Sequence, residues 1–301
     1  MTEGRKWLTT TDAITFEVRD RCARIALNRP EKRNSLSRPM IAEINAALKE
    51  ADDRTDVNVI LIEGNGKDFC AGYDLMGVYG GAADPESYDA GKYRSNAGSL
   101  DDDSWQLERT QEHLMFAFDA HKPIVAKVHG NCLAGGTDLA LGCDIVVAAD
   151  NAKIGFPATR ANGNPPNHWW IYHCGPQWAK RLLFTGDTIT GDTAAKLGLV
   201  LDAVPPEELD AYTDELVRRI GLVDADLLST HKRTVNFALE LAGARTLQRF
   251  SVELDARAHV SKGPRRTKFK KDFAESGLKA AFSGRDDDFG DSIVKLHSRG
   301  K

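Results

Sequence analysis

No stretch of the sequence is apolar for the roughly 20 residues that a membrane-spanning helix needs. The first seven residues also lack the apolar core of a secretory signal peptide. The sequence has no large excess of positive or negative charge: it contains 40 Lys and Arg and 44 Asp and Glu, for a net charge of −4. This balance lacks the basic field that favours binding to nucleic acids and anionic membranes. We therefore expect neither of those partners, and expect any anionic ligand to be held by a local site.

Cysteine is also scarce, at five residues, and no C-x-x-C pair occurs among them. In a chain of 301 residues with 42% apolar side chains, the core does not depend on disulfide bonds. We therefore expect reduced thiols in a cytoplasmic protein. The five residues are Cys22, Cys70, Cys132, Cys143 and Cys174.

The spacing of apolar residues in the first third of the chain predicts a hairpin and then a helix. Residues 14–20 and 22–28 alternate apolar and polar side chains around a short turn, which is typical of an antiparallel hairpin. Ser37 is a suitable N-cap for a helix with one buried stripe. The stripe comprises Met40, Ile41, Ile44, Ala47, Leu48 and Ala51.

Three short, almost continuously apolar runs follow, at 57–62, 124–128 and 145–149. Such runs are typical of the strands of an α/β fold that are covered on both faces. Between the first two lies 77–104, rich in Gly, Ala, Asp and Ser, which we interpret as a long surface loop. A helix is expected after it, over 105–120.

The last third of the chain carries helical patterns almost exclusively. A short helix over 193–197 and a strand over 199–201 are expected before Pro205 and Pro206, after which strand signals disappear. Four further helices are expected, at 206–220, about 224–243, about 244–261 and about 268–282. We therefore predict a core over residues 1–204 and a helical module over 205–301.

Two corners of the predicted fold let a ligand approach the main chain closely. After the strand at 124–128, the small residues 134–136 open a helical pattern, and the free N–H groups of a helix's first turn favour negative charge. After the strand at 57–62, Gly72 allows the same close approach. Either corner alone is explained more simply by a tight turn. On neighbouring parallel strands, the two are suited to aim one N–H group each at a single oxygen.

Several motifs along the chain become specific when they are taken in order. They are Asn28-Arg29-Pro30-x-x-x-Asn34-x-Leu36-Ser37, Phe69-Cys70-Ala71-Gly72-x-Asp74-Leu75, His129-Gly130-x-x-x-Ala134-Gly135-Gly136-x-x-Leu139, Cys143-Asp144-Ile145, and Thr185-Gly186-Asp187 with Gly198-Leu199-Val200. This series resembles the signature of the enoyl-CoA hydratase/isomerase, or crotonase, family, from roughly residue 14 to 285. The resemblance implies an α/β fold with a crotonase-like spiral of ββα turns, a C-terminal helical trimerisation module, and a coenzyme A thioester bound in a curved form.

The resemblance also assigns roles to residues at the two corners. It implies that the thioester carbonyl oxygen is held by the main-chain N–H groups of Tyr73 and Gly135. Such donors stabilise an enolate or tetrahedral oxyanion, and one donor contributes about 3–4 kcal/mol in comparable sites. The residues implied to bind the acyl-CoA are Ala71, Tyr73, Asp74, Leu75, Met76 and Gly135. For Asp74 two interpretations stay open, a structural cap or a polar wall of the pocket.

Hydratases of this family place two glutamates around the reacting double bond, and this chain departs from that pattern. The first position falls on Asp138, a carboxylate near the oxyanion corner that also suits the first turn of a helix. The second position falls on Ala158. A general acid or base contributes about 10²–10⁴-fold to such a reaction. We therefore expect Asp138 to be the remaining acid or base, and ordinary hydration is in question.

The segment that would carry the second acid, 161–175, is unusually aromatic and about three residues shorter than its family counterpart. His168, Tyr172 or His173 is a candidate to replace the acid, since His titrates near neutral pH. Arg160 is a candidate to replace it too, or to hold a carboxylate of the substrate. Both histidines are equally compatible with packing or capping. No metal site is expected, because the two histidines are five residues apart and no His-Glu-x-x-His motif occurs.

Two further motifs have plain interpretations. A basic run near the carboxyl end is typical of a solvated helix face, and the alternative is contact with the phosphates of coenzyme A. Residues 64–69 lack the third Gly of a dinucleotide loop and the Lys-Ser/Thr ending of a P-loop, so we interpret them as a turn after a strand. The basic run consists of Lys262, Arg265, Arg266, Lys268, Lys270 and Lys271.

The sequence therefore predicts an acyl-CoA-processing enzyme of the enoyl-CoA hydratase/isomerase type, a lyase or isomerase that needs no cofactor besides the coenzyme A of its substrate. Rival reactions through an enolate are hydrolysis of a carbon–carbon bond, a double-bond shift and decarboxylation, and Ala158 favours them. A non-catalytic acyl-CoA binder is the rival from another class. By resemblance, we expect a homotrimer or a dimer of trimers.

Overall fold

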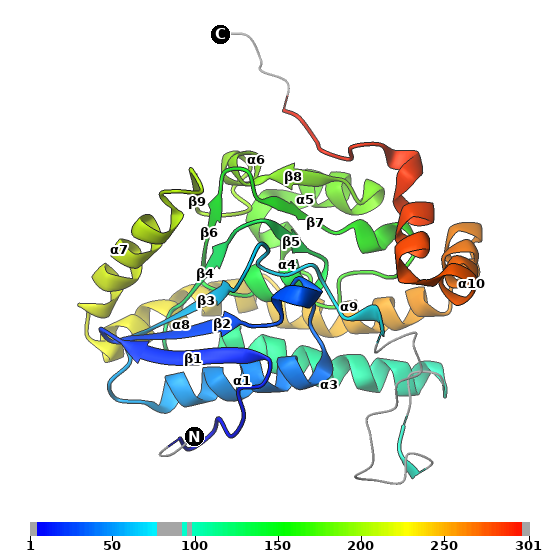
Figure 1. Cartoon of the computed structure of the whole chain (residues 1–301). Helices are drawn as coiled ribbons and strands as arrows, with labels where there is room; N and C mark the ends of the chain where they lie inside the picture. Colours follow the sequence, from blue (N-terminus) through cyan, green and yellow to red (C-terminus); the bar gives the residue numbers. More distant parts are fainter. Residues whose placement is uncertain (1–4, 77–91, 95–97, 297–301) are drawn as a thin grey trace.

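A computed structural model describes residues 5–76, 92–94 and 98–296 (Figure 1). A six-stranded sheet runs through the molecule in the order β1-β2-β3-β4-β6-β9. Its strands are β1 (Ile14–Arg19), β2 (Cys22–Leu27), β3 (Val59–Gly64), β4 (Ile124–Val128), β6 (Ile145–Ala149) and β9 (Asp202–Val204). A three-stranded sheet comprises β5 (Asn131–Leu133), β7 (Lys153–Gly155) and β8 (Thr188–Thr190).

The helices lie around these sheets, and the predicted α/β class is confirmed (Figure 1). The α-helices are α1 (Arg38–Asp53), α3 (Leu100–Asp119), α4 (Gly135–Ala140), α5 (Trp170–Thr185), α6 (Gly191–Lys196), α7 (Leu209–Gly221), α8 (Ala225–Leu241), α9 (Ala244–His259) and α10 (Pro264–Asp286). Three 3-10 turns are η1 (Pro30–Lys32), η3 (Pro157–Arg160) and η4 (Asp287–Phe289). None of the described helices has the length and apolarity needed to cross a membrane.

The central strands β3, β4 and β6 of the large sheet are buried on both faces, which explains their continuous apolar runs. β1 and β2 pair antiparallel as the predicted hairpin, and the other neighbours pair parallel. Side chains of one strand alternate between two cores. On β3, Ile60 and Ile62 enter the main core, whereas Val59 and Leu61 pack in a second cluster with Val217 of α7. The predicted buried strands are therefore confirmed, because each face of the strand meets its own apolar layer.

Helix α1 follows its predicted cap, but α3 begins earlier than expected. The Oγ atom of Ser37 accepts the Met40 N–H at 3.4 Å, which starts α1 at Arg38. α3 begins at Leu100, so the loop prediction is wrong for 100–104. The Oγ atom of Ser99 accepts the Asp102 N–H at 3.0 Å, and the aspartates of 101–103 favour the positive end of the helix dipole. The expected loop residues 77–91 and 95–97 lie outside the described residues.

The strand expected at 199–201 is displaced by a few residues. Leu199 donates its N–H to Ala194 and closes the end of α6, and β9 then pairs with β6 from Asp202. The small sheet and α5 were not predicted. Three residues are too few to show the alternation that identifies a strand.

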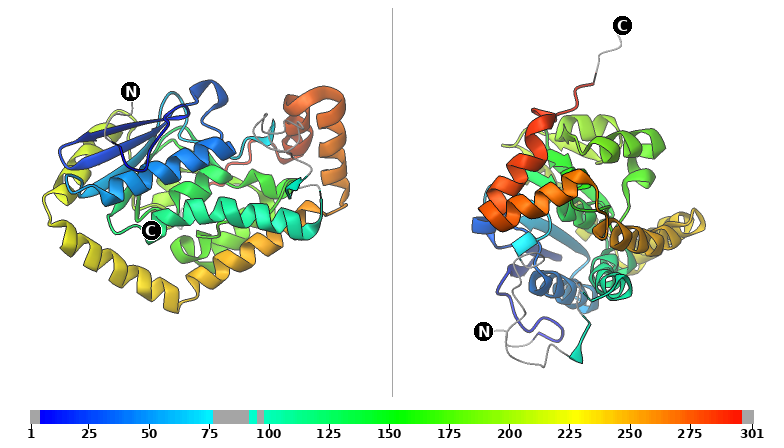
Figure 2. Two further views of the ribbon diagram at one scale, coloured as in Figure 1. Left: turned by 90° about the horizontal axis from the view of Figure 1, so that it is seen from below. Right: turned by 90° about the vertical axis from the view of Figure 1, so that its right-hand side faces the viewer.

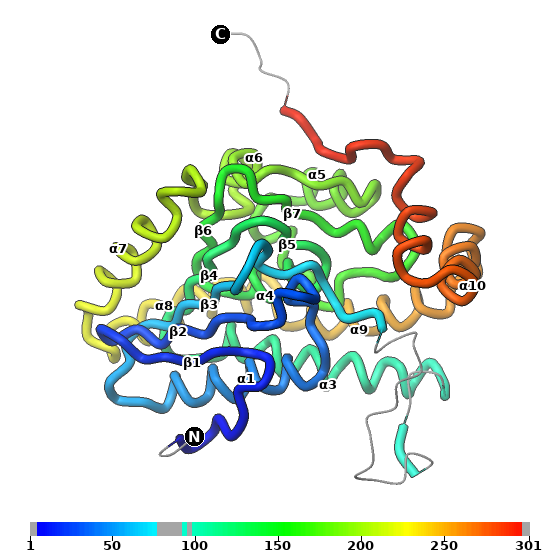
Figure 3. Tube along the Cα trace, viewed as in Figure 1, coloured from blue at the N-terminus to red at the C-terminus, as the bar shows by residue number. Residues whose placement is uncertain are grey.

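The four predicted C-terminal helices are confirmed as α7 to α10, and they differ in what they cover. α7 packs on the large sheet, and α9 lies beside α3. Figure 2 shows α8 and α9 along one outer edge of the molecule. The chain after α10 returns to the small sheet, where Ile293 pairs with Thr188 (Figure 3). The boundary at residue 204 stays a prediction.

Candidate active site

The two predicted corners lie side by side. Cys70, beyond the end of β3, forms a parallel bridge with Cys132 of β5. The Cys70 N–H donates to the Asn131 carbonyl at 2.9 Å, and the Leu133 N–H donates to the Cys70 carbonyl at 3.0 Å. Through this pairing, the segments after β3 and β4 leave the large sheet side by side and in register. It brings the segment after Cys70 against the start of α4.

Polar residues of the ordered motifs form the framework behind the corners. The side-chain amide of Asn34 donates to the carbonyls of Asn65 and Asp68, at 2.9 and 2.8 Å. The Asp68 carboxylate accepts the Asn131 N–H at 2.8 Å. Buried side chains with these bonds hold three loops together without a strand ladder. The motifs therefore describe a scaffold for the corner as well as the corner itself.

Asp74 belongs to this framework. Its Oδ2 atom lies 3.0 Å from the guanidinium of Arg29, and its Oδ1 atom accepts the Met76 N–H at 3.2 Å. Of the two interpretations of Asp74, these contacts fit the structural cap. The role of the other residues implied to bind acyl-CoA stays a prediction: the Ala71 N–H donates to the Arg33 carbonyl, Leu75 packs on the cluster of α10, and Met76 is half exposed.

The main-chain N–H groups of Tyr73 and Gly135 donate to no atom among the described residues. Leu36 pairs with the residues on either side of Tyr73, so the N–H of Tyr73 points away from it. Gly135 is the first residue of α4, where helix N–H groups have no partner in the helix. Ala134 before it has a φ of 47° and a ψ of −117°, a sparsely populated conformation that turns the chain into the helix.

Gly135 has no room for a side chain. A Cβ atom there would lie 2.9 Å from Cε2 and 3.0 Å from Cδ2 of the Tyr73 ring. The ring therefore lies directly against the main chain of Gly135. The structure thus brings together the two residues that were predicted to supply the oxyanion N–H groups.

The Tyr73 hydroxyl contacts Asp138, the third residue that was predicted to act at this corner. It donates to Oδ2 of Asp138 at 2.8 Å, and Asp138 is only 2% exposed. Burial raises the pKa of Asp138 well above its usual range, although the Tyr73 hydrogen bond lowers it in part. Burial and the nearby Asp138 also raise the pKa of Tyr73, which keeps its hydroxyl a donor. Burial therefore favours the neutral form of the Asp138 carboxyl group, and its Oδ1 atom has no partner among the described residues.

Most of the other buried polar atoms without a described partner belong to residues 162–170. Asn167 is 1% exposed and lies close enough to lower the pKa of Tyr73, but neither of its amide atoms has a hydrogen bond of good geometry. Buried polar groups are normally paired, so each of these atoms is a candidate for contact with water or a ligand. The atoms are Oδ1 of Asp103, Oδ1 of Asp138, Nδ2 of Asn162, both amide atoms of Asn167, Nδ1 of His168, Nε1 of Trp170 and Nε of Arg266.

The three aromatic candidates from the same segment are engaged differently. Gln248 of α9 accepts the His168 N–H at 2.6 Å, and burial lowers the pKa of the His168 ring. His173 Nε2 lies 3.0 Å from the Leu141 carbonyl, and burial lowers its pKa too. The Tyr172 hydroxyl donates to Ala242 at 3.3 Å. Only His168 keeps a buried ring atom free of a described partner, and the catalytic role of all three stays a prediction.

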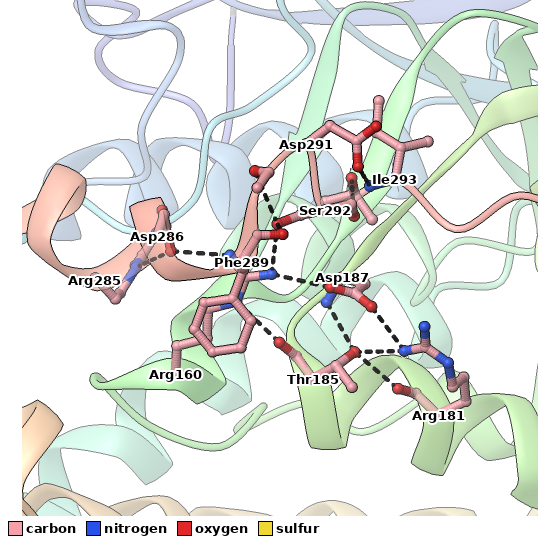
Figure 4. A network of polar contacts seen from close by, with 12 residues as sticks. Arg160, Arg181, Thr185, Asp187, Arg285, Asp286, Phe289, Asp291, Ser292 and Ile293 are labelled. Carbon is pink, nitrogen blue, oxygen red and sulfur yellow. Dashed lines mark hydrogen bonds and ion pairs between the residues drawn. The ribbon is translucent and has the colours of Figure 1, made fainter.

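Arg160 does not face a substrate carboxylate, because acids of this chain surround it (Figure 4). Its guanidinium lies 3.1 Å from both Asp187 and Asp286, and it donates to the Ser292 hydroxyl at 2.9 Å. The ring of Phe289 covers it at 3.9 Å. The side chain is 3% exposed, so we assign Arg160 to fixing the segment after α10.

Replacing Arg160 with Ala is expected to lower the free energy of unfolding by about 3 kcal/mol, because a buried, fully paired charge is lost. Urea denaturation measures this change. The matched control is Arg181→Ala, which also removes a partner of Asp187 but from a side chain that is 43% exposed. For it we expect a loss of less than about 1 kcal/mol. Equal losses would show that the buried network does not fix the C-terminal segment.

Two cations of the basic run form ion pairs with aspartates of α10 and η4. Arg265 pairs with Asp288, and Lys268 pairs with Asp272. Arg266 is buried and donates to the Ala161 carbonyl at 3.0 Å. These contacts fit the interpretation as a helix face for all but Arg266, which holds the segment that follows η3. Within the described residues no group of three or more His, Cys, Asp or Glu is arranged to hold a metal.

Sequence reasoning missed two buried residues beside the corner, Asn167 and Asp255. Asp255 of α9 is 4% exposed, burial raises its pKa to about 6, and its charge in turn raises the pKa of Asp138. Its position follows Gln248 and Ser251 on the inward face of α9. That helical spacing was the one signal available, and it indicates burial without indicating what the side chain faces.

Comparison with known proteins gives consistent matches. The profile of the enoyl-CoA hydratase/isomerase family matches residues 17–276. The crotonyl-CoA hydratase of Syntrophomonas wolfei subsp. wolfei is 32% identical over 212 residues, 69% of this chain and 75% of that protein. A solved enoyl-CoA hydratase from Mycobacterium smegmatis has a TM-score of 0.85 at 38% identity, over 95% of this chain and 97% of that one. An enoyl-CoA hydratase/isomerase from Xanthobacter autotrophicus Py2 has a TM-score of 0.83 at 31% identity, over 93% and 99%.

Proposed function

The chain belongs to the enoyl-CoA hydratase/isomerase family and is an acyl-CoA-processing protein of that family, and we propose that it adds water to 2-enoyl-CoA thioesters. The family resemblance and the crotonase fold expected from the sequence are confirmed. The observation that carries the proposal is the pair of N–H groups at Tyr73 and Gly135, which have no partner in the part of the chain that the structure describes, beside the buried carboxyl group of Asp138. Each part of this arrangement has a task in the reaction.

The two N–H groups polarise the thioester carbonyl. When a nucleophile adds to the β-carbon, negative charge develops on the carbonyl oxygen of the resulting enolate. Two fixed N–H donors stabilise that charge without having to reorganise, and the buried surroundings strengthen their effect. Because both donors belong to the main chain, the side chain at position 73 is free to serve another purpose. Here it holds Asp138 through its hydroxyl group.

Asp138 exchanges a proton with the α-carbon. The neutral carboxyl group keeps Oδ2 as the acceptor for Tyr73 and presents a proton from Oδ1. Proton transfer to the α-carbon converts the enolate into the product thioester. The raised pKa suits this role, since a group that is ionised at neutral pH has no proton to give.

A double-bond shift is the second candidate reaction. It needs a single group that removes a proton at one carbon and returns it at another, with no activated water. Ala158, at the position of the second glutamate, lies in η3 and packs on the main core, and it offers no acid or base. That observation favours isomerisation if no other group activates water.

The hydration assay separates these reactions. Purified protein with crotonyl-CoA is expected to remove the absorbance of the conjugated thioester, and the 3-hydroxyacyl product is identified by mass. A shift of the double bond in a 3-enoyl-CoA, with no addition of water, would support isomerisation instead. Tight binding of both thioesters with no turnover would make the protein an acyl-CoA binder and contradict the proposal.

We also propose a cytoplasmic homotrimer or dimer of trimers without a cofactor besides coenzyme A. The five cysteines are buried and unpaired, which fits a reducing compartment. α8 and α9 lie along an outer edge of the molecule (Figure 2). They have several exposed large apolar side chains, which suits contact with further copies. These side chains include Val235, Phe237, Leu241, Phe250 and Leu254.

A further inference from the structure

The inward face of α9 carries a buried carboxylate within electrostatic range of the Tyr73–Asp138 pair. Asp255 is 4% exposed, and its charge acts on both Tyr73 and Asp138. Its Oδ1 atom accepts the Asn164 N–H at 2.8 Å. Its Oδ2 atom has no hydrogen bond to the described residues, so one oxygen of the carboxylate is held and the other is free to act.

His259 lies beside Asp255, and Asp103 in turn contacts His259. His259, one turn further along α9, has its Nε2 atom 3.6 Å from Oδ1 of Asp255. Its Nδ1 atom lies 2.7 Å from Oδ2 of Asp103, at the start of α3. Asp103 is itself 4% exposed. A histidine between two carboxylates is fixed in orientation, and it favours the ionised form of the carboxylate beyond it.

The segment that lacks the second glutamate passes directly against Asp255. A Cβ atom on Gly163 would lie 2.3 Å from Oδ1 of Asp255, so the main chain there touches the carboxylate. Asn164 supplies its N–H to the same oxygen, and Asn167 reaches Tyr73 a few residues later. The segment from 163 to 167 thus spans the distance between Asp255 and the oxyanion corner.

We propose that Asp255 is the second carboxylate of the reaction, which activates water opposite Asp138, and that His259 and Asp103 position it. This inference rests on the proposed hydration. It removes the difficulty posed by Ala158, because the missing group is supplied by α9 rather than by η3. The structure assigns the two acids to different elements and different environments.

The environments of Asp138 and Asp255 suit these residues to different roles, one as the acid and the other as the base. Asp138 meets Tyr73 and the charge of Asp255, and burial raises its pKa well above the usual range. Burial raises the pKa of Asp255 only to about 6, because His259, the Asn164 N–H and Arg266 of α10 lower it, while Asp103 raises it. Burial thus favours the protonated form of Asp138, which suits the acid, whereas Asp255, with a pKa of about 6, is ionised at pH 7.5 and suits the base. Two carboxyl groups with pKa values pushed apart are the usual basis of such an assignment.

The proposed step balances in atoms and charge. Asp255 accepts a proton from water as the water oxygen bonds to the β-carbon and the double bond shifts its electrons toward the thioester oxygen. Asp138 gives its proton to the α-carbon, and the carbonyl re-forms. Exchange with solvent then returns a proton to Asp138 and removes one from Asp255. The net change is one water added to the enoyl thioester.

Asp255→Asn tests the role directly, because the amide keeps an oxygen for the Asn164 N–H. We expect kcat for hydration of crotonyl-CoA to fall about 10²–10³-fold. We also expect the acidic limb of the wild-type pH profile, with an apparent pKa of about 6, to disappear. The control is Glu253→Gln on the same helix, which is exposed and contacts Ser104, and for which kcat should not change.

A second reaction distinguishes the role of Asp255 from the roles of Asp138 and the oxyanion donors. Exchange of the α-protons of butyryl-CoA with deuterated water needs the oxyanion donors and the ionised form of Asp138, which removes an α-proton and returns a deuteron, but it needs no activated water. We expect Asp255→Asn to keep this exchange within about threefold of the wild-type rate, whereas Asp138→Asn loses it. For His259→Gln we expect the acidic limb to move to higher pH, because a charge that favours ionised Asp255 is removed.

Three results would overturn the proposal. Hydration by Asp255→Asn within threefold of the wild type, with the acidic limb unchanged, would show that Asp255 does not act on water. Loss of exchange together with hydration would show that it only holds the site together. If the wild type catalysed neither reaction, the proposed function itself would fail, and the role of Asp255 with it.

Discussion

Replacing Asp138 with Asn is expected to lower kcat for hydration of crotonyl-CoA by about 10²–10⁴-fold, the usual contribution of a general acid. The amide fits the same space and still accepts the Tyr73 hydroxyl, so the loss reports the missing proton. The measurement is the decrease of thioester absorbance under saturating substrate. The alternative role for Asp138, an acid that favours a helix dipole, predicts almost no change in kcat.

A matched control exists for that alternative. Asp192 lies in the first turn of α6, a helix of the same length as α4, and it is exposed and pairs with Lys196. Asp192→Asn therefore removes the same interaction with a helix dipole but no catalytic group. We expect it to leave kcat unchanged. Equal kinetic effects of the two substitutions would contradict the assignment of Asp138.

The stability of Asp138→Asn should depend on pH in a definite direction. The pKa of Asp138 is raised in the folded protein above its unfolded value near 3.8. The wild type therefore loses stability as the pH rises from below 3.8 toward the raised value, because the buried group resists ionisation. Asn does not titrate. Urea denaturation at pH 5 and pH 8 should show the variant gaining stability relative to the wild type at the higher pH, and a constant difference would contradict the raised pKa.

Replacing Gly135 with Pro should have the second large effect, because it removes the N–H group that we assign to the oxyanion. Proline is common at the first position of a helix, where the N–H has no helical partner, but here it also requires Ala134 to leave its φ of 47° and ψ of −117°. Loss of one such donor costs about 10²–10³-fold in comparable enzymes. We therefore expect kcat/KM for crotonyl-CoA to fall by that factor relative to a control with the same added atom.

Gly135→Ala is that control. Its Cβ atom also meets the Tyr73 ring at about 2.9 Å and displaces it, but its N–H remains. We expect a loss of about tenfold from the disturbed bond between Tyr73 and Asp138. Circular dichroism checks that both variants are folded, since Pro also restricts Ala134. If the Pro and Ala variants had equal kcat/KM values, the Gly135 N–H would have no part in the reaction.

Small residues after two predicted strands marked the corner, and the family resemblance assigned its residues. Tyr73, Gly135 and Asp138 are brought together because two parallel segments leave the sheet in register, and each segment is short and rich in small residues. The strands at 124–128 and 145–149 were also predictable, since burial on both faces leaves a continuous apolar run. In these regions the local pattern of small or apolar residues indicates the environment, although distant segments supply it.

What escaped prediction depends on distant segments. The charge of Asp255 acts on Asp138 only because α9 packs beside α3 and turns one face inward, and no local pattern indicates that arrangement. Arg160 was open to a binding role until its partners Asp187 and Asp286 were known. The start of α3 was missed for another reason: an aspartate-rich stretch reads as a loop, although acids are favoured in a helix's first turn.

The central claim is that the N–H groups of Tyr73 and Gly135 hold one thioester oxygen. The vibrational spectrum of bound crotonyl-CoA, labelled with ¹³C at the carbonyl carbon, measures this most directly. Two donors weaken the C=O bond, so we expect its stretching frequency to lie below that of the same thioester in water and to return toward that value in Gly135→Pro. A wild-type complex with the frequency found in water would contradict the account.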